Sequence, residues 1–267
     1  MRHIMAFFRL TGICLITGFA MGMFVLAIVF RLNTHKIPLY WHRAILGISG
    51  LQVNVVGTPS NLTPTLFASN HSSYWDIMVL GSLIEGSFIA KKEIASWPVI
   101  SFLAKLQKTY FVDRKPRHAQ EQLDDLALFL QGKRNLILFP EGTSNDGNRV
   151  YPFKPTLFRM AEQDHLVIQP VTVVYSLLDG MPVHRGLRPL TSWYGDMDLF
   201  SHLWTVLGMG TLQVDVVFHD VMNPSAFASR KDMAKQAHTI IEQGLDQRYR
   251  TAFMEHEPKT QRRRRHA

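Results

Sequence analysis

The chain has one cysteine in 267 residues, so it can form no disulfide within itself and no cysteine-based zinc site. Several catalytic signatures are also missing. The sequence contains no G-x-S-x-G nucleophile elbow, no P-loop, no H-E-x-x-H zinc motif and no glycine-rich dinucleotide fingerprint. These absences argue against elbow-type serine hydrolases, P-loop nucleotide hydrolases, zinc proteases and dinucleotide-dependent dehydrogenases. A catalytic triad scattered along the chain is left open.

Acidic residues are outnumbered, and the formal net charge is +8 at pH 7. Five of the positive charges come from Lys259 and the run Arg262 to Arg265, so residues 256–267 form a basic C-terminal tail. Such a tail binds anionic lipid head groups or nucleic acid, and a disordered solubilising tail has the same composition.

Charge is absent altogether from Leu10 to Phe30. A helix needs about 20 apolar residues to cross a bilayer, and this run is long enough. A signal peptide and an ordinary buried helix are the alternatives, but no small-x-small cleavage site follows. We therefore predict an uncleaved membrane anchor over residues 1–48. Basic residues flank the run on both sides, so its orientation is not fixed, and it is re-entrant if the chain folds back near Pro38 to Trp41.

Short β-rich runs alternate with helical patterns after residue 49, which predicts an α/β domain over residues 49–255. We expect a mostly parallel mixed sheet flanked by helices. The expected strands are 51–56, 65–69, 88–90, 109–112, 135–139, 166–175 and 212–218, of which 166–175 is one strand or two around Pro170. The expected helices are 74–84, 98–105, 117–130 and 229–250.

A titratable pair, His71 and Asp76, follows the strand expected at 65–69. Positions i and i+5 lie about 140° apart on a helix and cannot touch there. His71 is therefore expected in the loop before the helix and Asp76 in the first turns. The carboxylate then faces the positive end of the helix dipole and bonds one imidazole nitrogen. The other nitrogen is left as an acceptor, as a general base requires. A capping turn with a surface histidine is the alternative.

Two more polar groups stand at the ends of expected strands. Asp113 and Arg114 end one strand, and Glu141-Gly142-Thr143-Ser144 follows another. In open α/β sheets the ligand crevice lies beyond the carboxyl ends of the strands, so the three groups are expected to converge. Arg114 offers a planar fork for phosphate or carboxylate, and Gly142 lets backbone approach a ligand.

These residues carry a family resemblance. His71 to Asp76 matches the H-x4-D motif of the glycerolipid (lysophospholipid) acyltransferases, and Phe111 to Arg114, Phe139 to Thr143 and Ile168 to Val173 resemble the next three blocks, in order. The resemblance covers about residues 50–220. It implies an α/β domain with a membrane-embedding N-terminal helical segment.

The resemblance also implies a mechanism. His71 would deprotonate a lysolipid hydroxyl, Asp76 would orient the imidazole, and the oxygen would attack an acyl thioester directly. The donor would be acyl-carrier protein or acyl-CoA, with no metal and no further cofactor. Arg114, Glu141, Gly142 and Thr143 would position the acceptor. Because the donor is cytosolic, we expect the site at the cytoplasmic face of the inner membrane.

The position after Thr143 departs from the usual pattern. Relatives that act on lysophosphatidate usually have arginine there, whereas this chain has Ser144. With the run Trp193 to Asp198, this variant looks most like the lyso-ornithine lipid acyltransferases, whose acceptor has no phosphate. Lysophosphatidate is the alternative acceptor.

Two other functions fit parts of the sequence. A lipid hydrolase would use the same polar residues and release fatty acid without an acceptor. A membrane-tethered binding module would use the basic tail, but it leaves the ordered strand-end groups without a role. We therefore favour the acyltransferase and expect no nucleic-acid partner.

Overall fold

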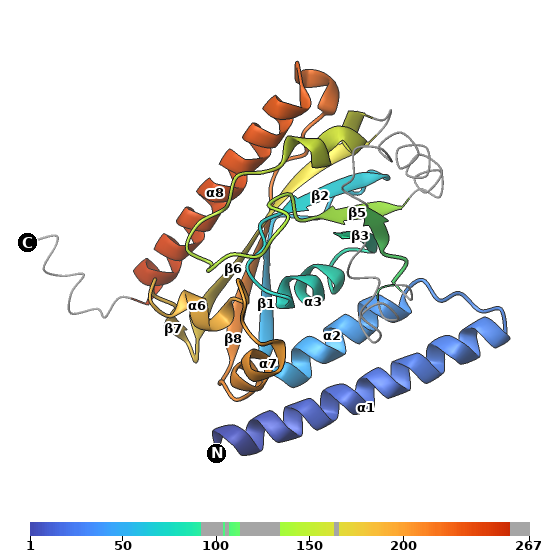
Figure 1. Ribbon diagram of the computed structural model, residues 1–267, viewed down its shortest axis with the longest axis vertical. Helices are drawn as coiled ribbons and strands as arrows, with labels where there is room; N and C mark the ends of the chain where they lie inside the picture. Colours follow the sequence, from blue (N-terminus) through green and yellow to red (C-terminus); the bar gives the residue numbers. More distant parts are fainter. Residues whose placement is uncertain (92–103, 105–106, 113–133, 163–165, 257–267) are drawn as a thin grey trace, which may run out of the picture.

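The computed structural model describes residues 1–91, 104, 107–112, 134–162 and 166–256. The described residues form an eight-stranded sheet with the order β1-β8-β6-β2-β5-β3-β4, and β7 pairs with β6 (Figure 1). The strands are β1 Leu51–Val56, β2 Thr65–Ser69, β3 Gly86–Lys91, β4 Tyr110–Val112, β5 Asn135–Leu138, β6 Val167–Leu178, β7 Met181–Pro182 and β8 Leu212–Phe218. The helices expected at 98–105 and 117–130 fall mostly or wholly outside the described residues.

Most neighbouring strands run parallel. β2 is parallel to both β5 and β6, β3 is parallel to β4 and β5, and β1 is parallel to β8. The antiparallel pairs are β6 with β8 and β6 with β7. The predicted α/β fold with a mostly parallel mixed sheet is therefore confirmed.

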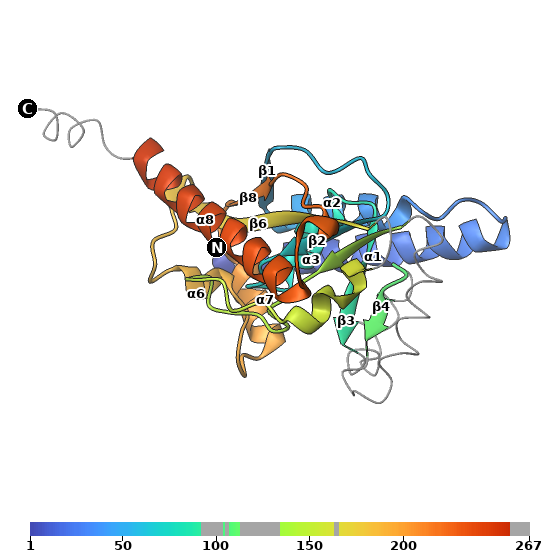
Figure 2. The same ribbon diagram turned by 90° about the horizontal axis from the view of Figure 1, so that it is seen from above.

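Helices cover both faces of the sheet. They are α1 Arg2–Val29, α2 Ile37–Ser49, α3 Trp75–Gly81, α6 Arg188–Thr191, α7 Leu199–Leu207 and α8 Arg230–Glu255, with 3₁₀ helices η3 Pro155–Glu162 and η4 Pro224–Ala226. In Figures 1 and 2, α8 lies on one side of the sheet and α3, α2 and α1 lie on the other.

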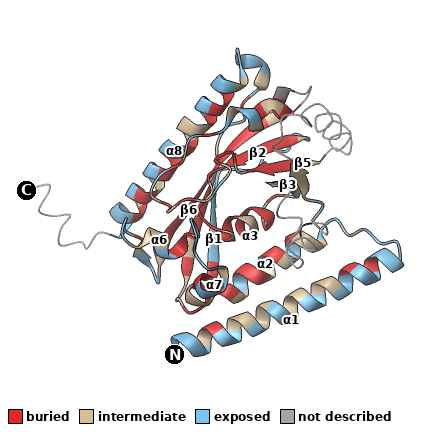
Figure 3. Cartoon of the chain, in the orientation of Figure 1, coloured by how far each residue is buried: buried red, intermediate tan, exposed pale blue. Residues whose placement is uncertain are grey.

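Successive side chains of β2 point to opposite faces of the sheet, so the strand contributes to one core cluster on each face. Leu66 and Ala68 pack in the cluster that includes Ile241 of α8. Phe67 points the other way, into the cluster with Val79 of α3. All five residues of β2 are buried, as expected for a central strand between two helical layers (Figure 3).

Two elements differ in extent from the prediction. β6 continues to Leu178, three residues beyond the predicted end. It is a single strand through Pro170, whose carbonyl accepts a hydrogen bond from the His219 N–H at 3.0 Å. α3 is shorter than the predicted 74–84 and ends at Gly81. A Cβ at Gly81 would overlap the ring of the buried His42, so glycine permits the close packing of α2 on α3.

The first two helices form a hairpin against the sheet domain. α1 begins at Arg2, eight positions before the predicted run, and the chain turns back so that α2 packs along it. Trp41 Nε1 donates to Thr17 Oγ1 at 3.2 Å between the two helices. Near its N-terminus, α1 also contacts α7, where Trp204 Nε1 donates to His3 Nδ1 at 3.0 Å. α1 therefore lies along the domain.

Much of α1 is exposed, as its pale blue turns in Figure 3 show, and its exposed side chains are mostly apolar. Large side chains on it that are more than half exposed include Phe7, Phe8, Leu15, Phe19, Leu26 and Val29. Among the described helices, α1 alone has the length and apolar character to cross a membrane. An exposed apolar face of this kind is typical of a surface that contacts a membrane or another protein.

Candidate active site

His71 and Asp76 lie where the spacing predicts. His71 follows β2 in the loop, and Asp76 stands in the first turn of α3. Their side chains meet, with 2.9 Å between His71 Nδ1 and Asp76 Oδ2. With Nδ1–H donating to the carboxylate, Nε2 keeps its lone pair. The His71 side chain is 19% exposed, whereas that of Asp76 is fully buried.

Asp76 is fully buried and its carboxylate is held by hydrogen-bond donors. Oδ2 accepts from the backbone N–H groups of Ser72 and Ser73 at 2.8 and 2.9 Å, in addition to His71. Oδ1 accepts from the Tyr175 hydroxyl at 2.6 Å. These donors stabilise the ionised carboxylate, which in turn stabilises a protonated His71.

Tyr175 of β6 is a component that the sequence prediction missed. Burial, followed by the nearby Asp76 carboxylate, raises the pKa of Tyr175 well above its usual value, so the phenol stays protonated and donates. In the sequence, Tyr175 is one apolar-looking residue of a strand. Nothing local marks it, because its partner is 99 positions away.

The main chain of His71 is hydrogen-bonded to the loop that follows β5. The His71 N–H donates to Glu141 Oε1 at 2.7 Å, and the His71 carbonyl accepts from the Asn145 N–H at 3.1 Å. The imidazole stacks on the ring of Phe139, with centroids 4.1 Å apart and planes 16° apart. Backbone and ring are thus both fixed, which limits the orientations that Nε2 can take.

Glu141 is buried, and both of its oxygens are engaged inside the protein. Oε2 accepts from Asn145 Nδ2 at 2.6 Å and from the Tyr151 N–H at 2.8 Å. Burial raises the pKa of Glu141 to about 7, although its donors oppose the shift. Its hydrogen bonds go to His71, Asn145 and Tyr151, and its predicted contact with the acceptor stays a prediction.

The other residues predicted to bind substrate lie in or near the same turn. Gly142 adopts the left-handed φ of 70°, and its N–H donates to the Phe139 carbonyl at 3.0 Å. Thr143 is exposed and Ser144 is partly buried. The loops carrying His71 and Thr143 therefore come together as predicted, while Arg114 lies outside the described residues.

Two long-range contacts complete the support of the loop. The Asn70 side chain pairs with β6 like a further strand residue, donating to the Val173 carbonyl at 2.9 Å and accepting from its N–H at 2.8 Å. The Trp193 N–H donates to the Ser72 carbonyl at 2.8 Å. The bond from Trp193 places the start of the run 193–198 beside the loop that carries His71.

No group of three or more metal-binding side chains gathers within the described ranges. The chemistry available here is that of a base oriented by a carboxylate, whose unprotonated ring nitrogen, Nε2, can accept a proton. Such a pair activates a hydroxyl or a water molecule.

Comparisons with known proteins identify the family of this chain. A sequence model of the acyltransferase family matches residues 52–174, which include both His71 and Glu141. The lyso-ornithine lipid O-acyltransferase of Rhizobium meliloti is 36% identical over 222 residues, covering 80% of this chain and 76% of that protein. The 1-acyl-sn-glycerol-3-phosphate acyltransferase of Neisseria gonorrhoeae is 33% identical over 166 residues, 61% of this chain and 63% of that protein.

A solved structure shares the fold. The crystal structure of the 1-acyl-sn-glycerophosphate acyltransferase of Thermotoga maritima superposes with a TM-score of 0.67 at 20% identity, covering 92% of this chain and 97% of that one. The long match to the Rhizobium protein and the family match around His71 together show that this chain is a member of the acyltransferase family.

Proposed function

We propose that the protein transfers a fatty acyl group from a thioester donor, acyl-carrier protein or acyl-CoA, to the free hydroxyl of a lysolipid. The observation that carries the proposal is the buried Asp76 carboxylate bonded to a partly exposed His71. The names of the Rhizobium and Neisseria relatives support the lysolipid acceptor.

The transfer needs one base and no covalent enzyme intermediate. His71 Nε2 takes the proton of the acceptor hydroxyl as its oxygen attacks the thioester carbonyl, and Asp76 stabilises the resulting imidazolium. The tetrahedral intermediate collapses, the carbon–sulfur bond breaks, and the thiolate takes the proton from His71. The products are an ester and a free thiol, and the histidine returns to its starting state.

The exposed apolar face of α1 supports a bilayer as the surface on which the enzyme works. A lipid acceptor then reaches His71 from the membrane, and a soluble donor reaches it from water. Since acyl thioesters are cytosolic, we propose the cytoplasmic face of the inner membrane as its location.

Lyso-ornithine lipid is the acceptor that we propose. Ser144 leaves the turn after Thr143 without a cation for a phosphate monoester, and the Rhizobium relative is named for this acceptor. Lysophosphatidate is the second candidate, which the Neisseria relative supports.

An acceptor panel tests the proposal. Purified protein with an acyl-carrier protein donor is expected to acylate lyso-ornithine lipid at least about tenfold faster than lysophosphatidate, measured by mass spectrometry of the products. A reaction without acceptor controls for hydrolysis. Faster turnover of lysophosphatidate would overturn the acceptor, and fatty acid release without any acceptor would favour a hydrolase.

The Ser144→Arg variant tests why the acceptor is chosen. The added guanidinium can form a charge-assisted hydrogen bond with phosphate, so we expect kcat/KM for lysophosphatidate to rise about tenfold relative to lyso-ornithine lipid. Ser144→Gln is the matched control, because it adds length and polarity without charge. An unchanged ratio in Ser144→Arg would remove residue 144 from acceptor selection.

A further inference from the structure

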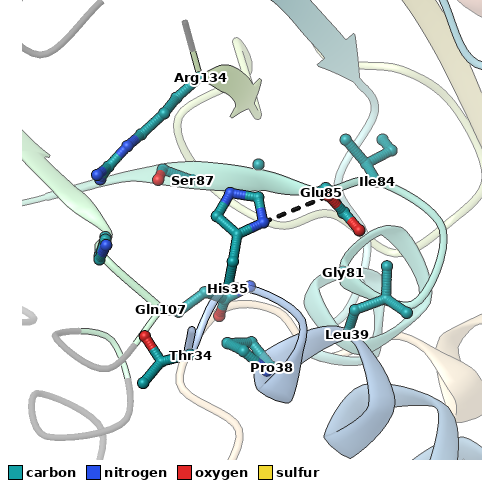
Figure 4. A pocket seen from close by; sticks show the side chains of 12 residues that line it. Thr34, His35, Pro38, Leu39, Gly81, Ile84, Glu85, Ser87, Gln107 and Arg134 are labelled. Carbon is teal, nitrogen blue, oxygen red and sulfur yellow. Dashed lines mark ion pairs between the residues drawn. The ribbon is translucent and has the colours of Figure 1, made fainter. Parts of the chain in front are cut away.

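The pocket beside the α1–α2 turn lies at the end of α3 away from the catalytic pair (Figure 4). Gly81, the last residue of α3, lines this pocket, whereas Asp76 stands in the first turn of the same helix. His35 Nδ1 and Glu85 Oε2 form an ion pair across it, 3.3 Å apart. Contacts that select the head group of an acceptor are therefore expected at the other end of α3, in the segments around His71.

One of these segments, residues 193–198, is bonded directly to the catalytic loop. It joins α6 to α7 (Figure 1), and the Trp193 N–H donates to the Ser72 carbonyl at 2.8 Å. Ser72 is the residue after His71, and its own N–H donates to Asp76 Oδ2 at 2.8 Å. The start of the segment therefore lies one residue away from the base in the hydrogen-bonded network.

The segment folds into a tight turn. The Met197 N–H donates to the Tyr194 carbonyl at 3.4 Å, and Gly195 adopts a left-handed φ of 60° that glycine tolerates without strain. Trp193 Nε1 donates to the Met197 carbonyl at 3.0 Å, which closes the turn against the indole. Asp196 consequently stands in the same turn as the indole ring.

The indole of Trp193 has a fixed orientation beside the catalytic loop. Its ring meets the ring of Tyr74 edge to face, with centroids 6.1 Å apart and planes 67° apart. The Tyr74 hydroxyl lies 3.1 Å from His202 Nδ1, and burial lowers the pKa of His202, so the neutral imidazole accepts this hydrogen bond. Because the Trp193 side chain is only partly buried, the indole remains open to a ligand.

The segment is acidic although the protein is basic. The chain has a formal charge of +8, yet no lysine or arginine occurs from residue 189 to residue 229. Asp198 caps α7 by accepting from the Ser201 N–H at 2.8 Å. The exposed carboxylate of Asp196 has no hydrogen-bond or ion-pair partner within the described part of the chain. An aromatic ring and a carboxylate without a partner, held in one turn, are groups that bind an ammonium ion.

The turn also lies on the side of the molecule that carries α1. Met197 and Phe200 expose apolar side chains at the start of α7. The other end of α7 packs on α1, where the Arg9 guanidinium donates to the Met209 carbonyl at 2.7 Å. Under the proposed function α1 contacts the bilayer, so the head group of a membrane lipid can reach this turn while the lipid hydroxyl lies at His71.

We propose that Trp193 and Asp196 form the subsite for a cationic head group, and that this subsite selects a lysolipid with an amine. The inference rests on the proposed function and identifies the part of the acceptor that is recognised. In lyso-ornithine lipid this part is the amine of the ornithine side chain, which would lie on the indole and donate to the Asp196 carboxylate. Lysophosphatidate has no ammonium, and Asp196 would repel its phosphate.

Two acceptors that differ in charge at the amine test this subsite. Lyso-ornithine lipid with one methyl group on the side-chain amine keeps the positive charge, whereas the acetylated amine is neutral. Both are presented to the full chain in neutral detergent micelles with an acyl-carrier protein donor. We expect kcat/KM to be about tenfold higher for the methylated acceptor, mainly through a lower KM, because the charged amine binds the carboxylate more strongly.

Three variants assign the preference to the turn. Asp196→Asn removes the charge with a residue suited to turns, so it should acylate the two acceptors with about equal kcat/KM. Trp193→Leu keeps the main-chain bond to Ser72 and should weaken the preference by about two- to fivefold. Asp220→Asn is the control, because Asp220 is exposed and follows β8, which runs antiparallel to β6 and ends at the opposite edge of the sheet. This variant should keep the wild-type preference.

Failure of the subsite and failure of the proposed reaction give different results. Equal use of the two acceptors by the wild type, or an unchanged preference in Asp196→Asn, would refute the subsite while acyl transfer to lyso-ornithine lipid stands. Transfer to lysophosphatidate but to neither ornithine acceptor would refute the proposed acceptor together with the subsite. Transfer to no acceptor at all would refute the proposed function itself.

Discussion

Replacing His71 with alanine is expected to lower acyl transfer by about 10²- to 10⁴-fold, because the acceptor hydroxyl loses its base. Product formation from lyso-ornithine lipid, followed by mass spectrometry at saturating donor, measures the loss. The side chain is partly exposed and its main-chain hydrogen bonds to Glu141 and Asn145 do not depend on the ring. The variant should therefore fold as the wild type does.

Added imidazole provides a sharper control for the same variant. The space beside Phe139 and Asp76 is left open when the ring is removed, so imidazole should restore part of the activity. A distant control, His184→Ala, should keep full activity, because His184 is exposed and its Nδ1 accepts a local hydrogen bond from the Gly186 N–H. Full activity in His71→Ala would refute the mechanism.

Asp76→Asn is expected to lower kcat by about 10²- to 10⁴-fold with little change in KM. The amide keeps the shape of the carboxylate but has no charge with which to stabilise the imidazolium. It also brings a donor among groups that already donate: the N–H groups of Ser72 and Ser73 on one oxygen and the Tyr175 hydroxyl on the other. We would measure kcat and KM by steady-state kinetics, on variant protein whose Tm matches that of the wild type.

Tyr175→Phe is the matched control for Asp76→Asn. It removes one donor from the carboxylate and keeps the charge, so its kcat should fall much less than that of Asp76→Asn. Equal losses in the two variants would show that the network acts through packing and not through the carboxylate charge. A rise in KM alone would move Asp76 from catalysis to substrate binding.

The geometry of the catalytic pair could be predicted because it is local. Five positions separate His71 from Asp76, and a strand, a loop and a helix start allow few arrangements of those residues. The same holds for the turn at Gly142, whose place after β5 follows from the apolar run before it. Short-range patterns of this kind also predict most of the strands.

The supports of the pair could not be predicted, because they depend on which strands become neighbours. Tyr175 bonds to Asp76, and Val173 bonds to Asn70, because β6 lies next to β2 in the sheet. Trp193 bonds to Ser72 from a separate loop. Sequence spacing contains no information on that order. Glu141 shows a related limit, because its three donors, from His71, Asn145 and Tyr151, could not be foreseen from its position after a strand.

The start of α1 was misplaced for an electrostatic reason. The predicted run begins after Arg9, because a charge normally ends an apolar span. In the structure the Arg9 guanidinium donates to the Met209 carbonyl at 2.7 Å and to the Leu207 carbonyl at 3.2 Å, at the end of α7. The carbonyl end of a helix attracts a cation, so the charge is accommodated within the helix.

The contact between Arg9 and the end of α7 also bears on how deep in a membrane His71 would lie. Arg9 links the hairpin to the end of α7, and Trp41 links its two helices, so direct contacts set the position of the apolar face of α1 relative to the sheet domain that carries His71. If α1 rests at a given level in the lipid, His71 rests at a given level too. A hydroxyl carried deeper or shallower by its lipid would then miss the base, and distance along the membrane normal would select among acceptors before any head group is recognised.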